Sequence, residues 1–193
     1  AVGAHWAFNS IGVLACAYAL GLDKEASAAA IRRISAGRGR GGQVDIDLTS
    51  GGSFRLIDES YNASPAAMRA AFAVLAMTPP SGAGKRIAIL GDMRELGSRG
   101  TDLHAALADD LLAASPGRVF TIGPLMRALR ARLPRVIRGA HGDVSADIAD
   151  VIAAEVRPGD VLLVKGSLGT NMAPIVAAIE ALAEPQRLLV NRR

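Results

Sequence analysis

The 193-residue sequence is poor in cysteine and in aromatic residues. Its single cysteine, Cys16, excludes a disulfide framework within the chain. Because Cys16 lies in an apolar helical run, we expect a small buried residue in a reducing, cytoplasmic setting. Aromatic residues make up only 4% of the chain, so few side chains can stack on bases. We therefore expect no nucleic-acid partner, and we interpret the net charge of +4 as suited to an anionic small substrate.

Long apolar runs are also missing. No run reaches the roughly 18 residues that a membrane-spanning helix needs, so we expect no membrane span. The first residues lack both an initiator Met and the pattern of a signal peptide. From this start we expect the chain to be a piece of a longer protein that does not act alone.

A phosphate-binding loop is the third absence. Gly37, Gly39 and Gly42 satisfy the GxGxxG spacing, but they follow a helical pattern and precede a strand, the reverse of a dinucleotide site. The segment 81–85 resembles the end of a phosphate loop, but Arg86 stands where a Ser or Thr would hold magnesium. We interpret the first segment as a linker and the second as a surface loop.

Apolar residues make up half of the sequence, and most are Ala, Val, Leu and Ile, which favours helices packed on a sheet. The periodicity predicts helices over 9–20, 23–36, 65–77, 103–114, 125–133, 146–156 and 174–182. It predicts strands over 43–49, 53–58, 86–90, 118–122, 135–137, 161–164 and 187–190. Alternating helices and short apolar strands indicate an α/β fold with a mostly parallel sheet flanked by helices, preceded by two helices. The glycine-rich segment 37–42 predicts a hinge and a domain boundary between 1–36 and 37–193.

Ligands of such sheets bind beyond the carboxyl ends of the strands, which directs attention to the strand-end residues. Asp58 and Glu59 end one predicted strand, and Tyr61 and Asn62 follow. A carboxylate there can accept hydrogen bonds from a ribose, but it can equally well cap the helix that begins near Pro65. The residues alone leave both interpretations open.

Other strand ends and one helix face carry further candidates. His104 follows a glycine-bounded charged segment, and by itself a lone His is more often a packing residue than a ligand. His5 and Asn9 are four residues apart on one helix face, where they either face a ligand or cap the helix. The charged or polar strand-end candidates are Asp92, Glu95, Lys165 and Ser167.

Several motifs occur together in a characteristic order. They are His5 with Asn9, Gly39-Arg40, the segment 58–65 (DESYNASP), the segment 91–97 (GDMRELG), His104, and the segment 164–167 (VKGS). The sequence thereby resembles the Mur ligase family of peptidoglycan synthesis over nearly its whole length. The resemblance implies a three-domain, cytoplasmic enzyme whose Rossmann-like C-terminal domain covers 37–193. Residues 1–36 would be the tail of the central ATP-binding domain.

The resemblance also implies an activity. ATP would phosphorylate the carboxylate of UDP-N-acetylmuramoyl-tripeptide, and the amine of D-alanyl-D-alanine would attack the acyl phosphate, releasing ADP and phosphate. The missing N-terminal and central domains of the same chain would supply the phosphate loop and the Mg²⁺ ligands, so no metal ligand is expected here. The chain would close the ATP and dipeptide cleft and be inactive alone. The alternative is a stand-alone nucleotide-binding or interaction module without catalysis.

Site residues carried over from the resemblance fall into three groups. Arg40 and Lys165 would be catalytic, with Arg38 as the alternative to Arg40 because Gly-Arg occurs twice. The nucleotide would be bound by His5, Asn9, Asp58, Glu59, Tyr61 and Asn62, with Glu59 favoured over Asp58 for the ribose. Substrate would be bound by Asp92, Glu95, His104 and Ser167. The sequence departs from the family pattern at Trp6, Ser64 and Leu168.

Overall fold

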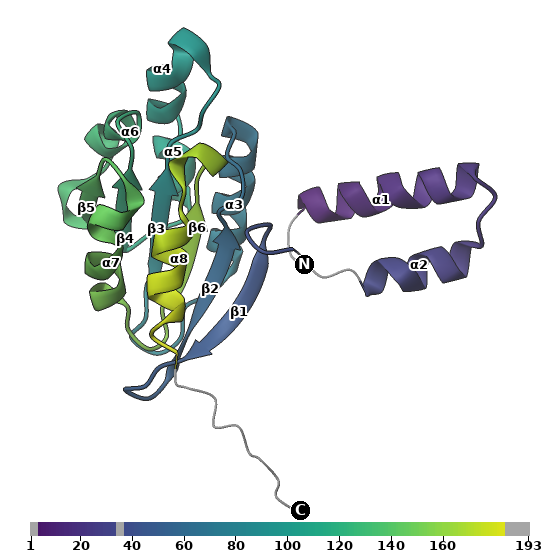
Figure 1. Cartoon of the computed structure of the whole chain (residues 1–193), viewed down its shortest axis with the longest axis horizontal. Coiled ribbons are helices and arrows are strands. Elements are labelled where there is room, and N and C mark those ends of the chain that lie inside the picture. The colour runs from purple at the N-terminus through teal and green to yellow at the C-terminus, as the bar shows by residue number, and fades with distance from the viewer. Residues whose placement is uncertain (1–3, 34–36, 184–193) are drawn as a thin grey trace, which may run out of the picture.

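The computed structural model describes residues 4–33 and 37–183. Its centre is a six-stranded sheet in the order β1-β2-β6-β3-β4-β5 (Figure 1). Within the sheet, β1 pairs antiparallel with β2, and all other neighbours are parallel. The strands are β1 (Gly42–Asp47), β2 (Ser53–Glu59), β3 (Arg86–Gly91), β4 (Arg118–Ile122), β5 (Arg138–Gly142) and β6 (Val161–Lys165). The predicted mostly parallel α/β fold is confirmed.

Helices cover both faces of the sheet. The helices are α3 (Pro65–Met77), α4 (Gly100–Ala105), α5 (Ala108–Ala113), α6 (Met126–Arg132), α7 (Ala149–Glu155) and α8 (Ala173–Glu180). Side chains of α3, α5 and α6 pack on one face with Ile57 and Leu163, whereas α7 and α8 pack on the other with Leu56 and Val164. Neighbouring strand residues therefore alternate between two apolar cores, as expected for a sheet buried on both sides.

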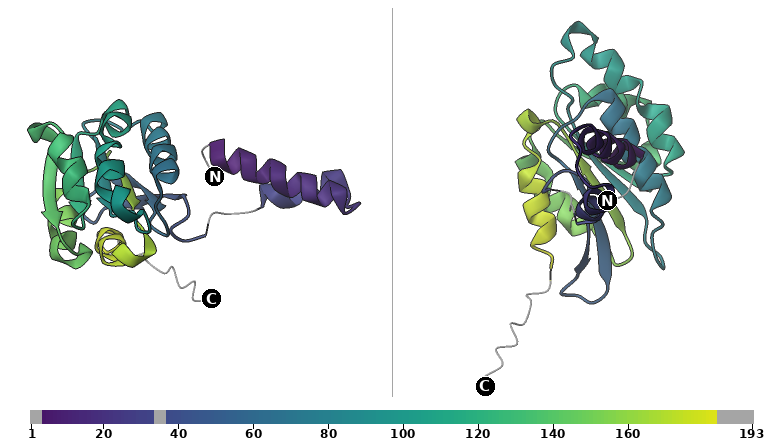
Figure 2. Two further views of the ribbon diagram at one scale, coloured as in Figure 1. Left: turned by 90° about the horizontal axis from the view of Figure 1, so that it is seen from above. Right: turned by 90° about the vertical axis from the view of Figure 1, so that its right-hand side faces the viewer.

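Two further helices, α1 (Ala4–Ala19) and α2 (Lys24–Arg32), stand beside the sheet rather than on one of its faces (Figures 1 and 2). Gly21, with φ +74°, lies in the turn between them, and the Asp23 carboxylate caps α2 by accepting from the Ala26 N–H at 2.7 Å. No helix in the described ranges is long and apolar enough to cross a membrane. Cys16 is exposed on α1, so the prediction of a buried cysteine was wrong.

The predicted strand over 135–137 was also wrong. These residues form a 3₁₀ turn after Pro134, and the strand begins at Arg138. The β5 sequence, RGAHG, contains two glycines, which strand propensities disfavour. Gly139 is required there because a Cβ would lie 2.7 Å from the Phe120 ring.

Other boundaries shift less. The predicted helix over 103–114 is divided into α4 and α5, and the helix over 146–156 begins with a 3₁₀ turn. The predicted helix over 23–36 ends at Arg32 among the described residues. Its last residues, 34–36, and the predicted strand over 187–190 lie outside the part of the chain that the structure describes.

Candidate functional site

A cavity of about 240 Å³ opens at the carboxyl ends of β2 and β6, and we call it the β2–β6 cleft. Its walls come from α1, the segment before β1, the loop between β2 and α3, and the end of β6. It is lined by Trp6, Asn9, Gly39, Arg40, Glu59, Tyr61, Asn62, Ala67 and Lys165. The structure therefore gathers six of the predicted site residues in one hollow, where the parallel-sheet rule places ligands.

Lys165 lies at the floor of the cleft. Its side chain is 2% exposed, and Nζ donates to the Asn62 carbonyl at 2.9 Å. The Glu59 carboxylate is 3.4 Å from the same ammonium, because Glu59 and Lys165 are register partners on adjacent parallel strands. Burial lowers the pKa of Lys165, and the charge of Glu59 and its hydrogen bond partly offset this effect. The ammonium is thus held by the protein and aimed at the strand ends.

The two carboxylates at the end of β2 have different environments. Asp58 is buried, and its oxygens accept from the Gly39 N–H at 2.9 Å and the Ser60 N–H at 3.1 Å. Glu59 points into the cleft beside Lys165. Neither carboxylate has a hydrogen bond to the first turn of α3, whose cap is the Ser64 hydroxyl. Asp58 therefore fixes the chain, and Glu59 is the carboxylate available to a ligand.

The glycine-rich segment before β1 is attached to the sheet domain. Besides the bond to Asp58, the Gly39 carbonyl accepts from the Tyr61 N–H at 3.0 Å, and the Gly41 N–H donates to the Asp58 carbonyl at 2.8 Å. A Cβ on Gly41, where φ is +88°, would come within 2.9 Å of the Glu59 carboxylate. Gly39 and Gly41 are thus hydrogen-bonded to β2 or to the loop after it, and Gly42 begins β1, whereas the hinge expected over 37–42 stays a prediction.

The two arginines of this segment have different partners. Arg40 places its guanidinium 3.7 Å from the centre of the Tyr61 ring, a cation–π contact inside the cleft. Arg38 pairs with Glu180 of α8 at 2.6 Å and does not line the cleft. Of the two alternatives left by the sequence, Arg40 is the one that the structure brings beside Glu59 and Lys165.

The amide residues contribute in different ways. The side-chain oxygen of Asn62 accepts a hydrogen bond from the Ala63 N–H at 2.8 Å, and its NH₂ group takes no part in this bond. Asn9 reaches the cleft from α1 and is exposed. His5 belongs to α1, but its side chain lies outside what the structure describes.

Asp92 and Ser167 do not line the β2–β6 cleft but support its edge. The Asp92 carboxylate caps α6 by accepting from the N–H groups of Leu125 and Met126 at 3.2 and 2.8 Å. Its carbonyl accepts from the Ser167 hydroxyl at 2.7 Å and from Thr170 at 3.0 Å. Both residues are buried and hydrogen-bonded within the protein, so neither is exposed for direct contact with a substrate.

His104 is fully buried beneath the same loop. Its Nε2 accepts from the Met93 N–H at 2.9 Å, so Nδ1 carries the proton and donates to the Gly100 carbonyl at 2.7 Å. Both ring nitrogens are used within the protein. Glu95 is exposed, with φ at +64°, and lies outside the cleft. Among the predicted substrate residues, Glu95 is therefore the one directed to solvent.

Sequence reasoning missed Gly39, Trp6 and Ala67 as cleft residues. Gly39 was assigned to a linker and to the Gly39-Arg40 motif, but its φ of +74° and its bonds to Asp58 and Tyr61 are what reveal its place in the cleft. Trp6 was noted only as a departure from a pattern. Among the described residues there is no group of three or more His, Cys, Asp or Glu side chains arranged to hold a metal ion.

Comparisons with known proteins agree with this architecture. Residues 46–168 match the family described as "Mur ligase, glutamate ligase domain". The UDP-N-acetylmuramoyl-tripeptide–D-alanyl-D-alanine ligase of Treponema pallidum is 34% identical over 170 residues, which are 86% of this chain and 35% of that protein. The ligase of the same name from Rickettsia prowazekii is 31% identical, over 89% of this chain and 36% of that protein.

Solved structures give the same result. A crystal structure of MurF from Acinetobacter baumannii has a TM-score of 0.78 and 25% identity, over 93% of this chain and 38% of that chain. MurF from Thermotoga maritima in complex with ADP has a TM-score of 0.69 and 24% identity, over 88% of this chain and 36% of that chain. This chain thus spans little more than a third of the length of these relatives. The sequence match and the shared Rossmann-like fold show that the chain belongs to the Mur ligase family and contains its C-terminal domain.

Proposed function

We propose that this chain is the C-terminal part of an ATP-dependent ligase that joins D-alanyl-D-alanine to UDP-N-acetylmuramoyl-tripeptide. The names of the two sequence relatives above support the substrates, and the Thermotoga maritima complex with ADP supports a nucleotide. In this reaction the tripeptide carboxylate takes the γ-phosphoryl group of ATP. The dipeptide amine then attacks the acyl carbon, and phosphate leaves as the amide bond forms. Residues 1–36 would belong to the central domain of the whole enzyme, and 37–193 to its C-terminal domain.

The observation that carries the proposal is the grouping of Arg40, Glu59, Tyr61 and Lys165 in the β2–β6 cleft. A guanidinium and an ammonium suit phosphate oxygens, and a carboxylate suits the hydroxyls of a ribose. The Arg40 guanidinium lies over the Tyr61 ring, 3.7 Å from its centre, and both side chains line the cleft. Asn9, Asn62 and the His5 position complete the nucleotide side in this proposal.

The volume of the cleft fits a shared site. About 240 Å³ is less than the roughly 300–1,000 Å³ usual for a drug-sized ligand, so this chain would form one wall of the nucleotide site. The four residues Asp92, Glu95, His104 and Ser167 would act at the dipeptide side, three of them by holding the loops in place. Mg²⁺ does not fit here, because Glu59 is the cleft's sole carboxylate among the described residues and it already faces Lys165. Its ligands would come from the rest of the enzyme.

Turnover assays test this proposal. The 193-residue chain with ATP, Mg²⁺ and both substrates is expected to release no ADP. A protein extended by the upstream region that the relatives possess is expected to form the amide bond and ADP together. In that longer protein, Arg40→Ala should lower kcat by about 100-fold, the scale for losing a charge-stabilising donor. Arg38→Ala is the matched control and should leave kcat nearly unchanged. An extended protein that binds ATP but forms no amide bond contradicts the proposal.

A further inference from the structure

Three neighbouring strands begin with an arginine. They are β3 with Arg86, β4 with Arg118 and β5 with Arg138. Because these strands are parallel and adjacent, their first residues lie side by side at the amino edge of the sheet. The β2–β6 cleft lies at the opposite, carboxyl edge. The amino edge therefore carries a row of cations that the proposed catalytic function does not use.

Acidic residues hardly balance this row. The segment 111–142 contains six arginines and neither Asp nor Glu, although one of the six, Arg127, lies at the opposite edge beside His141 and pairs with Asp143. Glu155 pairs with Arg118 at 2.8 Å, and the buried Asp160 is used by the backbone N–H groups of Lys85 and Arg157. Burial, followed by the charges of Arg138 and Arg118, lowers the pKa of Arg130, which lies near both of these arginines.

Helix capping accounts for part of the row. Arg86 donates to carbonyls at the end of α3, and Arg138 donates to the Leu133 carbonyl at the end of α6. Cations at helix C-termini are stabilised by the helix dipole, so these arginines have a structural role. The side chains of Arg132 and Arg135 have no such role, since neither side chain makes a hydrogen bond or ion pair within the described ranges.

Arg132 and Arg135 lie in an exposed turn with apolar residues. Pro134 is exposed between them, and Val136 is 82% exposed, more than any other large apolar residue among those described. A protruding apolar residue flanked by arginines suits an interface with anionic headgroups above and acyl chains below. Nucleic acid is less suited, because the sequence has no Phe, Trp or Tyr after Phe120 to stack on bases.

We propose that an amino-edge surface, formed by Arg132, Arg135 and Val136 beside the half-buried strand-start arginines, docks the protein on an anionic phospholipid bilayer. The arginines are drawn to the negative surface potential, and Val136 enters the headgroup region. One short apolar contact gives weak, reversible binding. The β2–β6 cleft faces away from the bilayer and remains accessible to soluble ligands.

Vesicle co-sedimentation of the 193-residue chain tests the docking. Vesicles of phosphatidylcholine with 40% phosphatidylglycerol are expected to bind the protein, and pure phosphatidylcholine vesicles are not. Raising NaCl from low concentration to about 0.5 M should release the protein, because salt screens the attraction. This readout needs no nucleotide or ligase activity, so its outcome is independent of the proposed function.

Charge variants locate the surface. The double variant R132E/R135E is expected to weaken binding by about tenfold or more, since each arginine near the surface contributes on the order of a fewfold to tenfold. R132Q/R135Q should give a smaller loss, and V136S should weaken binding by a few fold. The matched control is R32E/R33E, the same charge change at the end of α2, which should bind within about twofold of the wild type. Circular dichroism verifies that each variant is folded.

Three results would overturn the proposal. One is the absence of binding to phosphatidylglycerol vesicles. Another is an equal loss in R132E/R135E and R32E/R33E, which would mean that overall charge alone attracts the protein. The third is salt-sensitive binding to a DNA or RNA duplex, lost in R132E/R135E, without binding to vesicles.

Discussion

Neighbouring residues of the same type have opposite roles at the end of β2. The Asp58 carboxylate accepts from two backbone N–H groups, whereas the Glu59 carboxylate pairs with Lys165 on the adjacent strand β6. Because side chains alternate along a strand, Asp58 is buried within the protein and Glu59 faces the β2–β6 cleft. Which residue does which depends on where the Gly39 turn passes, and that contact bridges residues 19 apart in sequence.

Separate substitutions of this pair should therefore have separate effects. Asp58→Ala leaves two N–H groups without an acceptor and should lower the free energy of unfolding by about 2–4 kcal/mol. Glu59→Ala in the longer enzyme should raise the KM for ATP with little change in stability. Urea unfolding and steady-state kinetics measure the two effects. If Glu59→Ala shows normal ATP kinetics, the ribose role is wrong.

His141 at the end of β5 makes stability depend on pH. Its Nε2 accepts from the Arg127 side chain at 3.1 Å, so Nδ1 donates to the Thr121 hydroxyl at 2.9 Å. Burial, followed by the charge of Arg127, lowers the pKa of His141 from its usual value of 6.5. The folded state then favours the neutral ring, so the unfolded state binds more protons in this range.

The expected consequence is a loss of stability as the pH falls. The contribution of His141 is complete above about pH 6.5 and decreases as the pH drops toward the lowered value. Urea unfolding at pH 7.5 and 5.5 should show a larger decrease for the wild type than for His141→Gln. All other titrating groups are present in both proteins and cancel in the comparison. A decrease of equal size in both proteins contradicts the assignment.

Among the elements, the sequence pattern was most reliable where local signals agreed. Helix α3 was predicted with its correct ends because Ser64 caps it and Pro65 occupies its first turn. The hairpin of β1 and β2 was found from Gly51 and Gly52, both of which have positive φ. Strand β5 was misplaced because its edge position and its packing on Phe120 are tertiary facts, which a window of sequence does not contain.

The loop before β3 shows another element-scale constraint. The segment 81–85, which only superficially resembles a phosphate loop, approaches the turn before β6 so closely that a Cβ on Gly84 would lie 2.1 Å from the Gly159 carbonyl. The Ser81 N–H also donates to that carbonyl at 2.9 Å. Glycine at position 84 therefore allows the backbone of segment 81–85 to lie against the backbone of the turn before β6.

Replacing that glycine should be costly. Backbone atoms cannot give way as a flexible side chain does, so Gly84→Ala should destabilise the protein by at least about 1–3 kcal/mol. Gly42→Ala is the control, because a Cβ there meets nothing within 4 Å and φ is not positive. Denaturant midpoints compare the two variants. Equal midpoints would show that the two loops separate easily.

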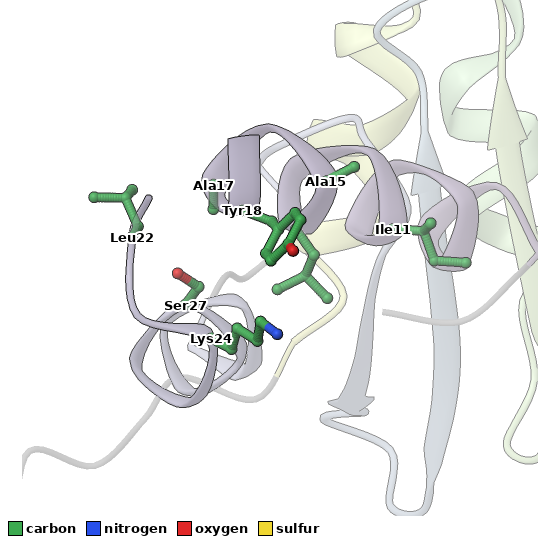
Figure 3. Close-up of a pocket in the computed structure, with 8 residues that line it drawn as sticks. Ile11, Ala15, Ala17, Tyr18, Leu22, Lys24 and Ser27 are labelled. Carbon is green, nitrogen blue, oxygen red and sulfur yellow. The ribbon is translucent and has the colours of Figure 1, made fainter. Parts of the chain in front are cut away.

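At the scale of the whole molecule, burial is unevenly distributed. Every residue of β6 is buried, whereas α2 has no buried residue, and Phe8 of α1 and Leu20 just after α1 are 75% and 77% exposed. Between α1 and α2 lies an open, mostly apolar hollow of about 380 Å³ (Figure 3). Opening of a segment costs free energy in proportion to the contacts that it breaks. The helices α1 and α2 should therefore be locally less stable than the sheet.

Hydrogen exchange provides the measurement. Amides of α1 and α2 are expected to exchange orders of magnitude faster than those of β3 and β6 in the 193-residue chain. In a protein extended by the upstream region of the relatives, exchange in α1 and α2 should slow while exchange in β6 stays unchanged. Uniform protection across the 193-residue chain contradicts the expectation.

The sequence predicted the sheet and most of the residues that gather in the β2–β6 cleft, but it did not predict what each of the candidate site residues contacts. Strand ends and motifs brought Glu59, Tyr61 and Lys165 together because parallel strands place their carboxyl ends at one edge. The supporting roles of Asp92 and Ser167 were not predictable, because each depends on partners from distant segments, whereas His104 has the packing role that is more usual for a lone His.

The attachment of residues 39–41 to β2 decides where the polypeptide can be cut. A shortened chain beginning at Gly42, the first residue of β1, would contain the complete sheet. It would nevertheless lack Arg40 and would leave the Asp58 carboxylate buried without its Gly39 donor. A shortened chain beginning at Gly37 retains both. The structural border of this domain therefore lies several residues ahead of its first strand, and trimming to secondary structure would remove part of the site.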